Sequence, residues 1–519
     1  MKPQLRTHGG VASVLNFSSG TAASILLLAV SVVATPWILR LLGSETFGAA
    51  RALADVMAYA GLLELGLAPA MRGEIAMAIG KGDERRVATI LATGLRIYVL
   101  PISMMVAAGL LLTLLLPKLI QTAQISHRDL YWAGLISIIP SLLVFNLPFR
   151  MLAEAQNRAY LSTTLIAMQL LLATLLAVVF AWLGWGLVGQ AAAQCLAQIP
   201  VSVAFIAITT RQLPGFWKAL PDEAVRKSLW RLNWHNFFFA ASGRLALLSD
   251  NLIVSWMLGA ALVTPFYLTQ RLLAIVAGQL QQISSSTWAP LAQLYASGQS
   301  STFRRRFLQL SAATSGLGIA SLSVLAGYNQ HFLARWVGAQ SYGGDSITVL
   351  AAANAWFLAV YSLWAWPFAG CSKMDKLAPY AALAMGVNVA GSFSATRWLG
   401  SPGPLVGTLI ANLLVGSWSY TLLLQRHFGI APSDLWRSVL GNFGWGVPFG
   451  SLTWIAAHSH VPRNWISLAG EMSFAALCGL GLWWTFGMSR DDRTFWKDRA
   501  GTMSNRFLRQ RRQPELVEN

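Results

Sequence analysis

An apolar stretch near the start of the chain, FGAARALADVMAYAGLLELGLAP at residues 47–69, contains three charged side chains, Arg51, Asp55 and Glu64. An ionisable side chain at the centre of a bilayer costs about 3 kcal/mol or more, so such residues usually face a cavity, a substrate or a partner. Arg51 and Asp55 are four residues apart and would share one face of a helix. Two interpretations follow. The two residues form an ion pair within the helix, or Arg51 binds phosphate through its planar guanidinium while Asp55 orients it.

Glu64 is the third charge of this stretch, and it lies nine residues beyond Asp55. On a helix this spacing places Glu64 on the opposite face and about 13 Å further along the axis. Glu64 therefore belongs to a different cluster. Two roles stay open for it: it stabilises the cytoplasmic end of the helix, or it makes a gating contact there.

Later apolar stretches also contain charged residues, and three of them are further candidates for the same site: Arg244, Asp250 and Arg271. Arg244 and Asp250 are six residues apart, so they point in different directions and need different partners. We predict that these three residues bind substrate together with Arg51 and Asp55. Asp55, Asp250 and Glu64 are the candidate groups for ion coupling, and the sequence does not select one of them.

The composition is that of a membrane protein. Of the 519 residues, 55% are hydrophobic and 11% are charged, whereas soluble domains carry about 25% charged residues. A net charge of +18 would suggest nucleic acid binding in a soluble protein. Here the basic residues lie in short loops between apolar runs, which excludes a basic surface able to hold a nucleic acid backbone.

Fourteen segments are long and apolar enough to cross the bilayer, which needs about 20 residues per helix. Their approximate limits are 14–41, 46–70, 87–116, 129–151, 159–183, 186–210, 229–258, 262–295, 305–327, 346–371, 376–399, 403–425, 438–458 and 464–488. Because fourteen is an even number, both termini fall on the same side of the membrane.

The distribution of Lys and Arg gives the orientation, since short cytoplasmic loops retain positive charge. With both termini in the cytoplasm, 28 of the 38 basic residues lie inside, six lie outside and four lie within spans. One missed or extra span would exchange the inside and outside assignment of every loop that follows it. The charge distribution therefore supports fourteen spans.

The spans and loops predict five parts of the chain. They are an N-terminal lobe of helices 1–6 (1–211), a cytoplasmic linker (212–228), a C-terminal lobe of helices 7–12 (229–427), helices 13 and 14 (428–489) and a basic cytoplasmic tail (490–519). Every loop is short, so no soluble catalytic domain is appended. The tail is expected to lie near the membrane surface, attracted to anionic lipid.

Motifs for metals, cofactors and nucleotides are missing from the sequence. The three cysteines, Cys195, Cys371 and Cys478, lie far apart in apolar runs and indicate neither a disulfide framework nor a zinc site. His458 and His460 form an HSH motif without a third ligand. No GxxxxGK[ST] loop is present, so ATP hydrolysis is not expected. We predict no cofactor, no metal and no catalytic residue.

A weak internal repeat relates two segments, LLGSETFGAARALADVMAYAG (41–61) and MLGAALVTPFYLTQRLLAIVAG (257–278). The offset between them is 216 to 221 residues, which matches helices 1–6 repeating as helices 7–12. Duplicated halves are common in transporters, where the substrate site lies between them. With an offset of 216, Arg271 takes the position of Asp55, and the two would pair across the lobes.

The segment LGSETFGAARALADVMAYAGLLELGLAPAMRGEIAMAIGKGDERRVATIL (42–91) resembles the second helix and following loop of bacterial polysaccharide flippases. These flippases belong to the multidrug/oligosaccharidyl-lipid/polysaccharide exporter superfamily. The matching elements are LG, ETFG (45–48), ELGL (64–67) and GD (82–83). Later segments, WAPLAQLYASGQSSTFRRRF and FLARWVGAQSYGG, also fit. Glu64 stands where the family more often has Asp.

This resemblance implies an all-α integral membrane fold with about fourteen transmembrane helices. Two six-helix bundles would form an inverted V around a central cavity, with two extra C-terminal helices. Such proteins flip undecaprenyl-diphosphate-linked oligosaccharide repeat units across the bacterial inner membrane, and glycan polymerases and glycosyltransferases are their expected partners. In the related lipid II flippases, arginines lining the cavity serve the diphosphate, and Arg51 and Arg271 match them by helix number.

Two other classes of function stay open on sequence. A cation-coupled multidrug or small-molecule antiporter of the same superfamily would typically have twelve spans and a buried acid in its first helix, but residues 14–39 carry no charge. A membrane-embedded glycan polymerase or ligase needs a large outer loop, and every outer loop here is short. We therefore expect a transporter and not an enzyme.

Overall fold

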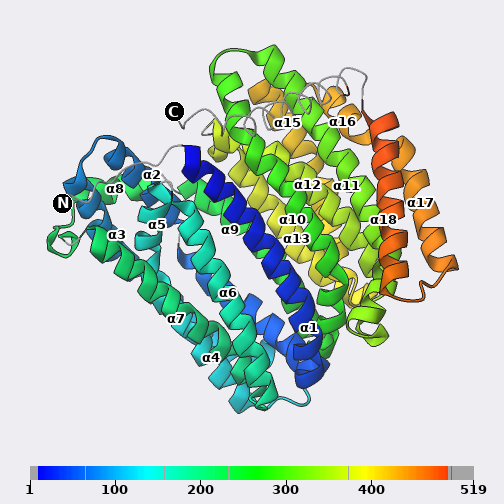
Figure 1. Ribbon diagram of the computed structural model, residues 1–519, viewed down its shortest axis with the longest axis horizontal. Coiled ribbons are helices and arrows are strands. Elements are labelled where there is room, and N and C mark those ends of the chain that lie inside the picture. The colour runs from blue at the N-terminus through cyan, green and yellow to red at the C-terminus, as the bar shows by residue number, and fades with distance from the viewer. Residues whose placement is uncertain are drawn as a thin grey trace, which may run out of the picture. The chain divides into compact units, whose positions relative to one another are not determined.

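The structure is a computed structural model that describes residues 10–488, apart from residues 65, 157, 214, 232, 233 and 372, together with Arg493. The basic tail predicted for 490–519 otherwise lies outside the described residues. All regular elements of the described chain are helices (Figure 1).

The α-helices follow one another with short connections. Their bounds are α1 (Gly10–Gly61), α2 (Leu67–Gly80), α3 (Glu84–Leu119), α4 (His127–Leu142), α5 (Leu147–Ala155), α6 (Ala159–Trp182), α7 (Gly186–Gln212), α8 (Glu223–Arg231), α9 (Trp234–Leu258), α10 (Ala260–Ala296), α11 (Ser300–Trp336), α12 (Asp345–Gly370), α13 (Met374–Leu399), α14 (Gly403–Ala411), α15 (Ser417–Phe428), α16 (Pro432–Leu440), α17 (Phe443–Ser459) and α18 (Trp465–Leu482). Short 3₁₀ turns are η1 (Leu62–Glu64), η2 (Leu143–Asn146), η3 (Phe216–Lys218) and η4 (Ala339–Ser341), and η5 (Asn412–Gly416) and η6 (Trp483–Gly487) are π-helical.

Ten helical segments among the described residues are long and apolar enough to cross a membrane. The chain is thus an all-α multi-pass membrane protein. The predicted spans 14–41 and 46–70 share the long helix α1, which is interrupted at Gly43 by a non-helical φ of 76°. The predicted spans 229–258, 376–399 and 438–458 correspond to α9, α13 and α17, which are helices but are not among the ten. The count of fourteen crossings stays a prediction.

The described chain divides into two compact units. The first unit comprises the residues up to Leu268 together with Trp336–Gly343 and Ala378–Ala411. The second comprises Thr269–Arg335, Gly344–Leu377 and the residues from Asn412 onward. Packing defines these units, whereas the lobes at 1–211 and 229–427 were defined by membrane topology, and that division stays a prediction.

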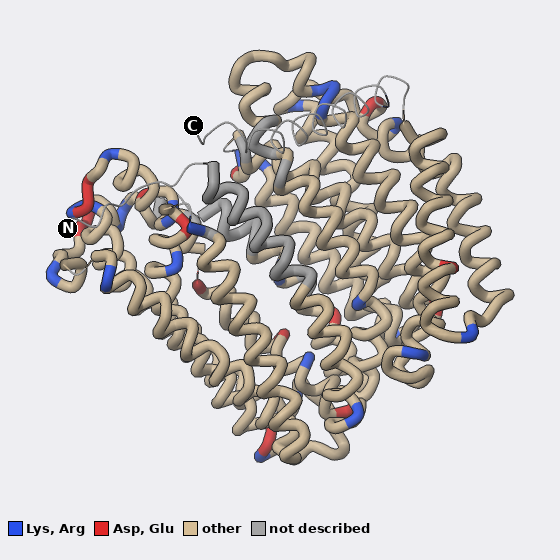
Figure 2. The backbone as a smooth tube through the Cα atoms, viewed as in Figure 1, with Lys and Arg blue, Asp and Glu red and all other residues tan. Residues whose placement is uncertain are grey.

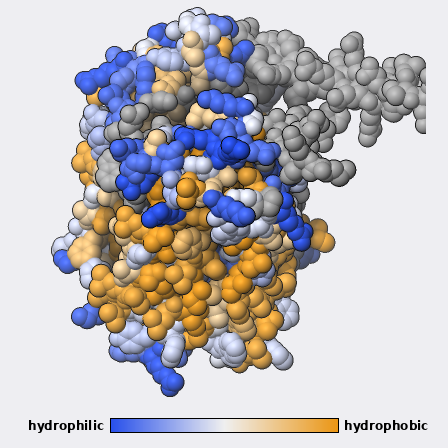
Figure 3. Space-filling view, turned by 90° about the vertical axis from the view of Figure 1, so that its left-hand side faces the viewer, coloured by the Kyte–Doolittle hydropathy of each residue, from blue (hydrophilic) through white to orange (hydrophobic). Residues whose placement is uncertain are grey.

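Charged and apolar residues are separated along the helices. Lys, Arg, Asp and Glu lie mostly at helix ends and in connecting segments, and the helix middles contain few of them (Figure 2). On the face seen in the space-filling view, apolar side chains form a broad continuous band below a polar cap (Figure 3). An apolar band of this kind is the surface that bilayer lipids cover.

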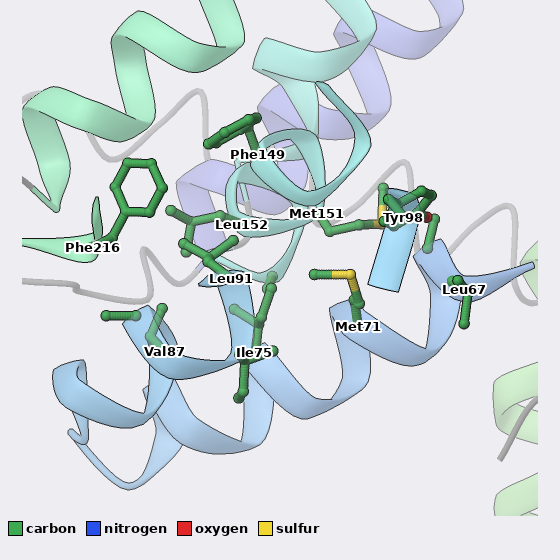
Figure 4. Packing of buried hydrophobic residues seen from close by; sticks show 14 of the residues in the cluster. Leu67, Met71, Ile75, Val87, Leu91, Tyr98, Phe149, Met151, Leu152 and Phe216 are labelled. Carbon is green, nitrogen blue, oxygen red and sulfur yellow. The ribbon is translucent and has the colours of Figure 1, made fainter. Parts of the chain in front are cut away.

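The predicted linker 212–228 is folded onto the first unit. Phe216 of η3 and Val225 and Leu229 of α8 are buried in an apolar cluster with α2, α3, α5 and α7. Figure 4 shows side chains of this cluster, in which the rings of Phe149 and Phe216 lie 5.7 Å apart. Burial of these side chains holds the linker against the helices of the unit.

Polar contacts add to this apolar attachment of the linker. Arg86 of α3 pairs with Asp222 at 2.9 Å, and Ser228 of α8 donates to Glu74 of α2 at 2.6 Å. A hydrogen bond from the backbone N–H of Ala224 lowers the pKa of Asp222. Asp222 is therefore charged at neutral pH and can hold Arg86.

The two segments of the weak repeat pack closely against each other through Gly48 of α1. A Cβ atom added at Gly48 would lie 2.0 Å from the carbonyl oxygen of Ala260, the first residue of α10. Backbone atoms cannot move aside as a flexible side chain can. The absence of a side chain at Gly48 is therefore what allows this contact.

We expect Gly48→Val to destabilise the protein by about 1–3 kcal/mol, the usual cost of overpacking a close contact. The measurement is the thermal unfolding midpoint of the purified protein in detergent. Gly61→Val is the matched control, because a Cβ at Gly61 on the same helix has no neighbour within 4 Å. Equal midpoints for the two variants would contradict the packing role of Gly48.

Candidate functional site

Arg51 lies on α1 between two aromatic rings. Its guanidinium carbon is 5.0 Å from the ring centroid of Phe47, one turn earlier on the same helix. It is also 5.0 Å from the ring centroid of Tyr267 on α10. Both distances are within the roughly 6 Å range of cation–π attraction. The two rings hold the guanidinium in place without using its N–H donors.

The ion pair between Arg51 and Asp55 is not present among the described residues, where no nitrogen of Arg51 comes within 4.0 Å of a carboxylate oxygen. Asp55 does not orient the guanidinium by a hydrogen bond either. It instead accepts a hydrogen bond of 2.7 Å from the Nδ2 atom of Asn251 on α9. The five N–H donors of Arg51 are thus not used by any described carboxylate.

Asp250 precedes Asn251 on α9 and lies near Asp55. The two carboxylates are close enough to interact electrostatically, and the hydroxyl of Tyr59 on α1 interacts with both. The side chain of Ser249 forms a hydrogen bond with Asp250. The Oδ1 atom of Asp250 is buried and has no hydrogen-bond partner among the described residues. Two acids thus share a confined space between α1 and α9, and one has a free oxygen.

Glu64 stabilises the bend at the end of α1. Its Oε1 atom accepts hydrogen bonds from the hydroxyl of Tyr98 at 2.7 Å and from the backbone N–H of Ala68 at 3.2 Å. Ala68 is in the first turn of α2, where an acidic group satisfies a free N–H. Gly66 joins the two helices with a left-handed φ of 65°. These contacts give Glu64 a structural role, and its gating role stays a prediction.

The remaining predicted residues are Arg244 and Arg271. Arg244 is exposed on α9 and lies within electrostatic range of Glu64. It is thus associated with the Glu64 bend and not with the Asp250 side chain on its own helix. Arg271 is half-buried on α10 and belongs to the second unit. Its pairing with Asp55 stays a prediction.

Contacts between the two repeat segments indicate a different register from the one that pairs Arg271 with Asp55. Thr264 donates to the carbonyl of Ser44 at 2.6 Å, across a separation of 220 residues. Phe47 and Tyr267 are in ring contact at 6.3 Å with the same separation. Residues related by two-fold symmetry contact each other near the axis. In this register, Arg271 corresponds to Arg51.

Several residues of this site were not predicted. Phe47 and Tyr267 hold Arg51, and Asn251 holds Asp55. Asn251 had a signal in the sequence, because it is a polar residue next to Asp250 in an apolar run. Tyr98 had none, since its bond to Glu64 spans 34 residues. No group of three metal-ligating side chains occurs among the residues that the structure describes.

The helical arrangement is the fold of the MOP superfamily, a class of membrane transporters. Lipid II flippase MurJ in an inward closed conformation aligns with a TM-score of 0.66 and 12% identity, covering 92% of this chain and 99% of that one. An inward-facing multidrug resistance MATE family transporter aligns with a TM-score of 0.55 and 15% identity, and the alignment covers 83% of this chain and 98% of that one. A MOP superfamily transporter from Pyrococcus furiosus aligns with a TM-score of 0.56 and 16% identity, and the alignment covers 85% of this chain and 95% of that one.

The chain belongs to the polysaccharide biosynthesis protein family, because the sequence model of this family matches residues 14–293, more than half of the chain. No match was found among curated proteins. The predicted family is confirmed, and the fold is the one seen in MATE transporters and in lipid II flippase MurJ.

Proposed function

We propose that the protein flips undecaprenyl-diphosphate-linked oligosaccharide repeat units from the cytoplasmic to the periplasmic leaflet of the bacterial inner membrane. Transport proceeds by alternating access of a central cavity between two six-helix bundles in an inverted V. Both termini are cytoplasmic, and the flipped units serve exopolysaccharide, capsule or O-antigen synthesis. Glycosyltransferases that build the unit and a polymerase that consumes it are the functional partners.

The observation that carries this proposal is the state of Arg51. A cation within a membrane-spanning helix needs an anion. Asp55 interacts electrostatically with Arg51, but no described carboxylate oxygen lies within 4.0 Å of this guanidinium. Phe47 and Tyr267 fix its position and leave its N–H donors available. A diphosphate group offers paired oxygens that match the guanidinium in a bidentate manner. Arg51 is thus suited to bind the charged part of a lipid diphosphate.

The other predicted residues complete the proposed site. Arg271, which corresponds to Arg51 in the 220-residue register, supplies a second guanidinium for phosphate. Arg244 acts at the cytoplasmic entrance together with Glu64. Glu64 accepts hydrogen bonds from Tyr98 and Ala68, and these bonds hold the bend that gates the entrance.

Asp55 and Asp250 couple transport to an ion gradient. Two nearby carboxylates in a confined space repel each other when both are charged, so binding of one proton or one monovalent cation is favoured. The free Oδ1 atom of Asp250 is available to such an ion. We thus assign coupling to this pair and not to Glu64, because two donors already occupy Glu64.

The same acidic pair favours a second candidate function, a cation-coupled antiporter of small molecules. Antiporters need an acidic group that alternates between ion and substrate. The two candidates differ in their substrate: the flippase moves a lipid-linked glycan and the antiporter moves a soluble cation. Arg51 favours the flippase, because a fixed positive charge repels cationic substrates.

Deletion of the gene tests the proposed function in the source organism. We expect lipid-linked repeat units to accumulate on the cytoplasmic leaflet and surface glycan to disappear, because synthesis of the unit continues without export. Mass analysis of extracted lipids and enzymatic labelling of the periplasmic leaflet measure the two effects. Re-expression of the intact chain is the control. If the deletion strain had normal levels of lipid-linked intermediates but lower resistance to cationic dyes, the flippase function would be contradicted and the antiporter function supported.

A further inference from the structure

A polar stretch in the middle of α10 takes no part in the site described above. It reads GQLQQISSST at residues 278–287, with three glutamines and no charged side chain. Its first eight residues lie within the apolar span Ala260–Ser285. Polar side chains in a membrane span usually contact a neighbouring helix or face the interior of the protein. The buried face of α10 separates these two possibilities.

One face of α10 is buried, and exposed polar residues lie on the other. Four buried side chains are spaced four, three and four residues apart, which places them on one face of the helix. They are Leu273, Ala277, Leu280 and Ser284. At about 100° per residue, Gln282 lies nearly opposite this face, and Gln279 and Ser285 flank Gln282. These three polar side chains are exposed, so helix packing does not account for them.

The exposed polar residues lie halfway along their helix. Gly278 is the middle residue of α10, and Gly318 is the middle residue of α11. Both helices contain a segment long and apolar enough to cross the membrane. A Cβ atom added at Gly318 would lie 3.6 Å from the Cδ1 atom of Leu280. The middles of two membrane-crossing helices therefore meet next to Gln279, which places it at the depth of the bilayer interior.

Lipid is not suited to cover this face of α10. On α17 and α18 of the same unit, apolar side chains occupy exposed positions, such as Leu452, Ile455 and Leu477 at 67%, 62% and 69% exposure. Such positions match hydrocarbon. An exposed amide in hydrocarbon loses its hydrogen bonds to water and gains none. Gln279 and Gln282 therefore face water in the interior of the transporter.

A hydrogen bond holds the side chain of Gln282 in place. The hydroxyl of Ser285 donates to the Oε1 atom of Gln282 at 3.0 Å, and the amide NH₂ group remains as a donor. The side chain of Gln279 makes no hydrogen bond to any described residue, so its amide offers both donors and an acceptor. A side chain that is already oriented loses less entropy when it binds a ligand.

The groups on this face select the chemistry of the ligand. An amide both donates and accepts hydrogen bonds, and so does the hydroxyl of a sugar. The oxygens of a diphosphate accept, and a metal cation takes oxygen ligands alone. Arg271, the charged residue on the same side of α10, lies about 12 Å along the helix axis from Gln279. The amides therefore suit an uncharged, hydroxyl-rich part of a ligand, at a distance from its charged group.

We propose that Gln279 and Gln282 bind the saccharide of the lipid-linked substrate and contribute to the choice of repeat unit. The inference rests on the proposed function, because that function supplies a saccharide attached to a diphosphate. Arg51 and Arg271 bind the diphosphate, which all repeat units of this kind share. The two amides bind the part that differs from one repeat unit to another.

Gln282→Cys tests whether this face of α10 meets water. The full chain is placed in vesicles of phosphatidylethanolamine and phosphatidylglycerol and treated with a charged maleimide, and peptide mass spectrometry reads each cysteine. Cys478 on α18 is the internal control, because it is exposed next to the exposed apolar Leu477. We expect the introduced thiol to react at least roughly tenfold faster than Cys478, since the reactive thiolate forms in water. Equal rates would place Gln282 in lipid and overturn the proposal.

Binding of two probes tests the contact with the saccharide. One probe is undecaprenyl diphosphate, and the other is the pool of lipid-linked saccharides extracted from the source organism. The full chain with Gln279→Met and Gln282→Met together should bind the saccharide-carrying lipids roughly tenfold more weakly, because hydrogen bonds to sugar hydroxyls are lost. Its affinity for undecaprenyl diphosphate should stay unchanged. Both dissociation constants are measured on purified protein in detergent.

Gln293→Met is the matched control, since Gln293 is an exposed amide of the same helix beyond the apolar span. It should keep both affinities. Gln282→Met alone replaces the double variant if the thermal unfolding midpoint of the latter is lowered. Unchanged affinity for the saccharide-carrying lipids, or an equal loss for the two probes, would overturn the proposal.

The binding experiment and the deletion experiment fail separately. Binding needs no transport, so selective loss of saccharide binding together with normal lipid-linked intermediates in the deletion strain would overturn the flippase and keep the saccharide site. Accumulated lipid-linked units together with unchanged saccharide binding by the double variant would overturn the saccharide site and keep the flippase.

Discussion

Arg51→Ala is expected to reduce surface glycan by about 10- to 100-fold or more while the protein stays inserted and folded. The guanidinium is the group proposed to bind the diphosphate, and a charged hydrogen bond contributes about 1.5–3 kcal/mol, with each 1.36 kcal/mol equal to a factor of ten in rate. Surface glycan and membrane protein level are measured together in the deletion strain that carries each variant. Arg271→Ala should behave in the same way, because it corresponds to Arg51 in the 220-residue register.

Two variants separate phosphate binding from other roles of Arg51. Arg51→Lys keeps the charge but loses the planar guanidinium. We therefore expect its level of glycan export to lie between the levels of the unmodified chain and of the alanine variant. Arg40→Ala removes an exposed arginine of the same helix and should export normally. Full export by Arg51→Ala and Arg271→Ala at normal protein levels would exclude both residues from phosphate binding.

Asp250→Asn is expected to abolish the response of transport to an imposed ion gradient. The substitution keeps the shape of the side chain but removes the charge that binds the coupling ion, and Asp55→Asn should act alike because the two carboxylates interact. The assay is flipping of a labelled lipid-linked oligosaccharide in proteoliposomes, with proton and sodium gradients applied in separate arms. We expect slow, gradient-independent flipping to remain, since the diphosphate site is intact.

Asp345→Asn is the control for this experiment, because Asp345 is an exposed acid at the start of α12. It should retain the response to both gradients. A gradient response that persists in Asp250→Asn and Asp55→Asn would remove the pair from coupling. The gradient that accelerates flipping by the unmodified chain identifies the coupling ion as a proton or as sodium.

Much of the architecture could be read from the residues alone. A bilayer accepts only segments whose backbone is internally bonded and whose side chains are apolar for about 20 residues. Eleven of the predicted segments accordingly lie in ten long apolar helical segments, and the ETFG and ELGL motifs identified the family that the comparison confirms. The predicted boundary between the first two spans was also close, because α1 consists of two helices that meet at a kink at Gly43.

The partners of the charged residues could not be read in this way. Arg51 and Asp55 have the spacing of an ion pair, yet Arg51 lies against Phe47 and Tyr267 while Asp55 is bonded to Asn251. Helix periodicity specifies which face a residue occupies, but not what the neighbouring helix presents to that face. The partners Tyr267 and Asn251 are about 200 residues away along the chain, so no local pattern contains them.

The sequence by itself determined the class of protein, the family and the charges that lie within the apolar segments, because burial in lipid restricts composition at every position of a span. The tertiary structure decided which of those charges meet, how Glu64 is held, and that Gly48 permits contact with Ala260. It alone revealed the apolar cavity of about 880 Å³ between α11, α12 and α17. Apolar residues that line a cavity and apolar residues that fill a core have the same composition and spacing, and only packing distinguishes them.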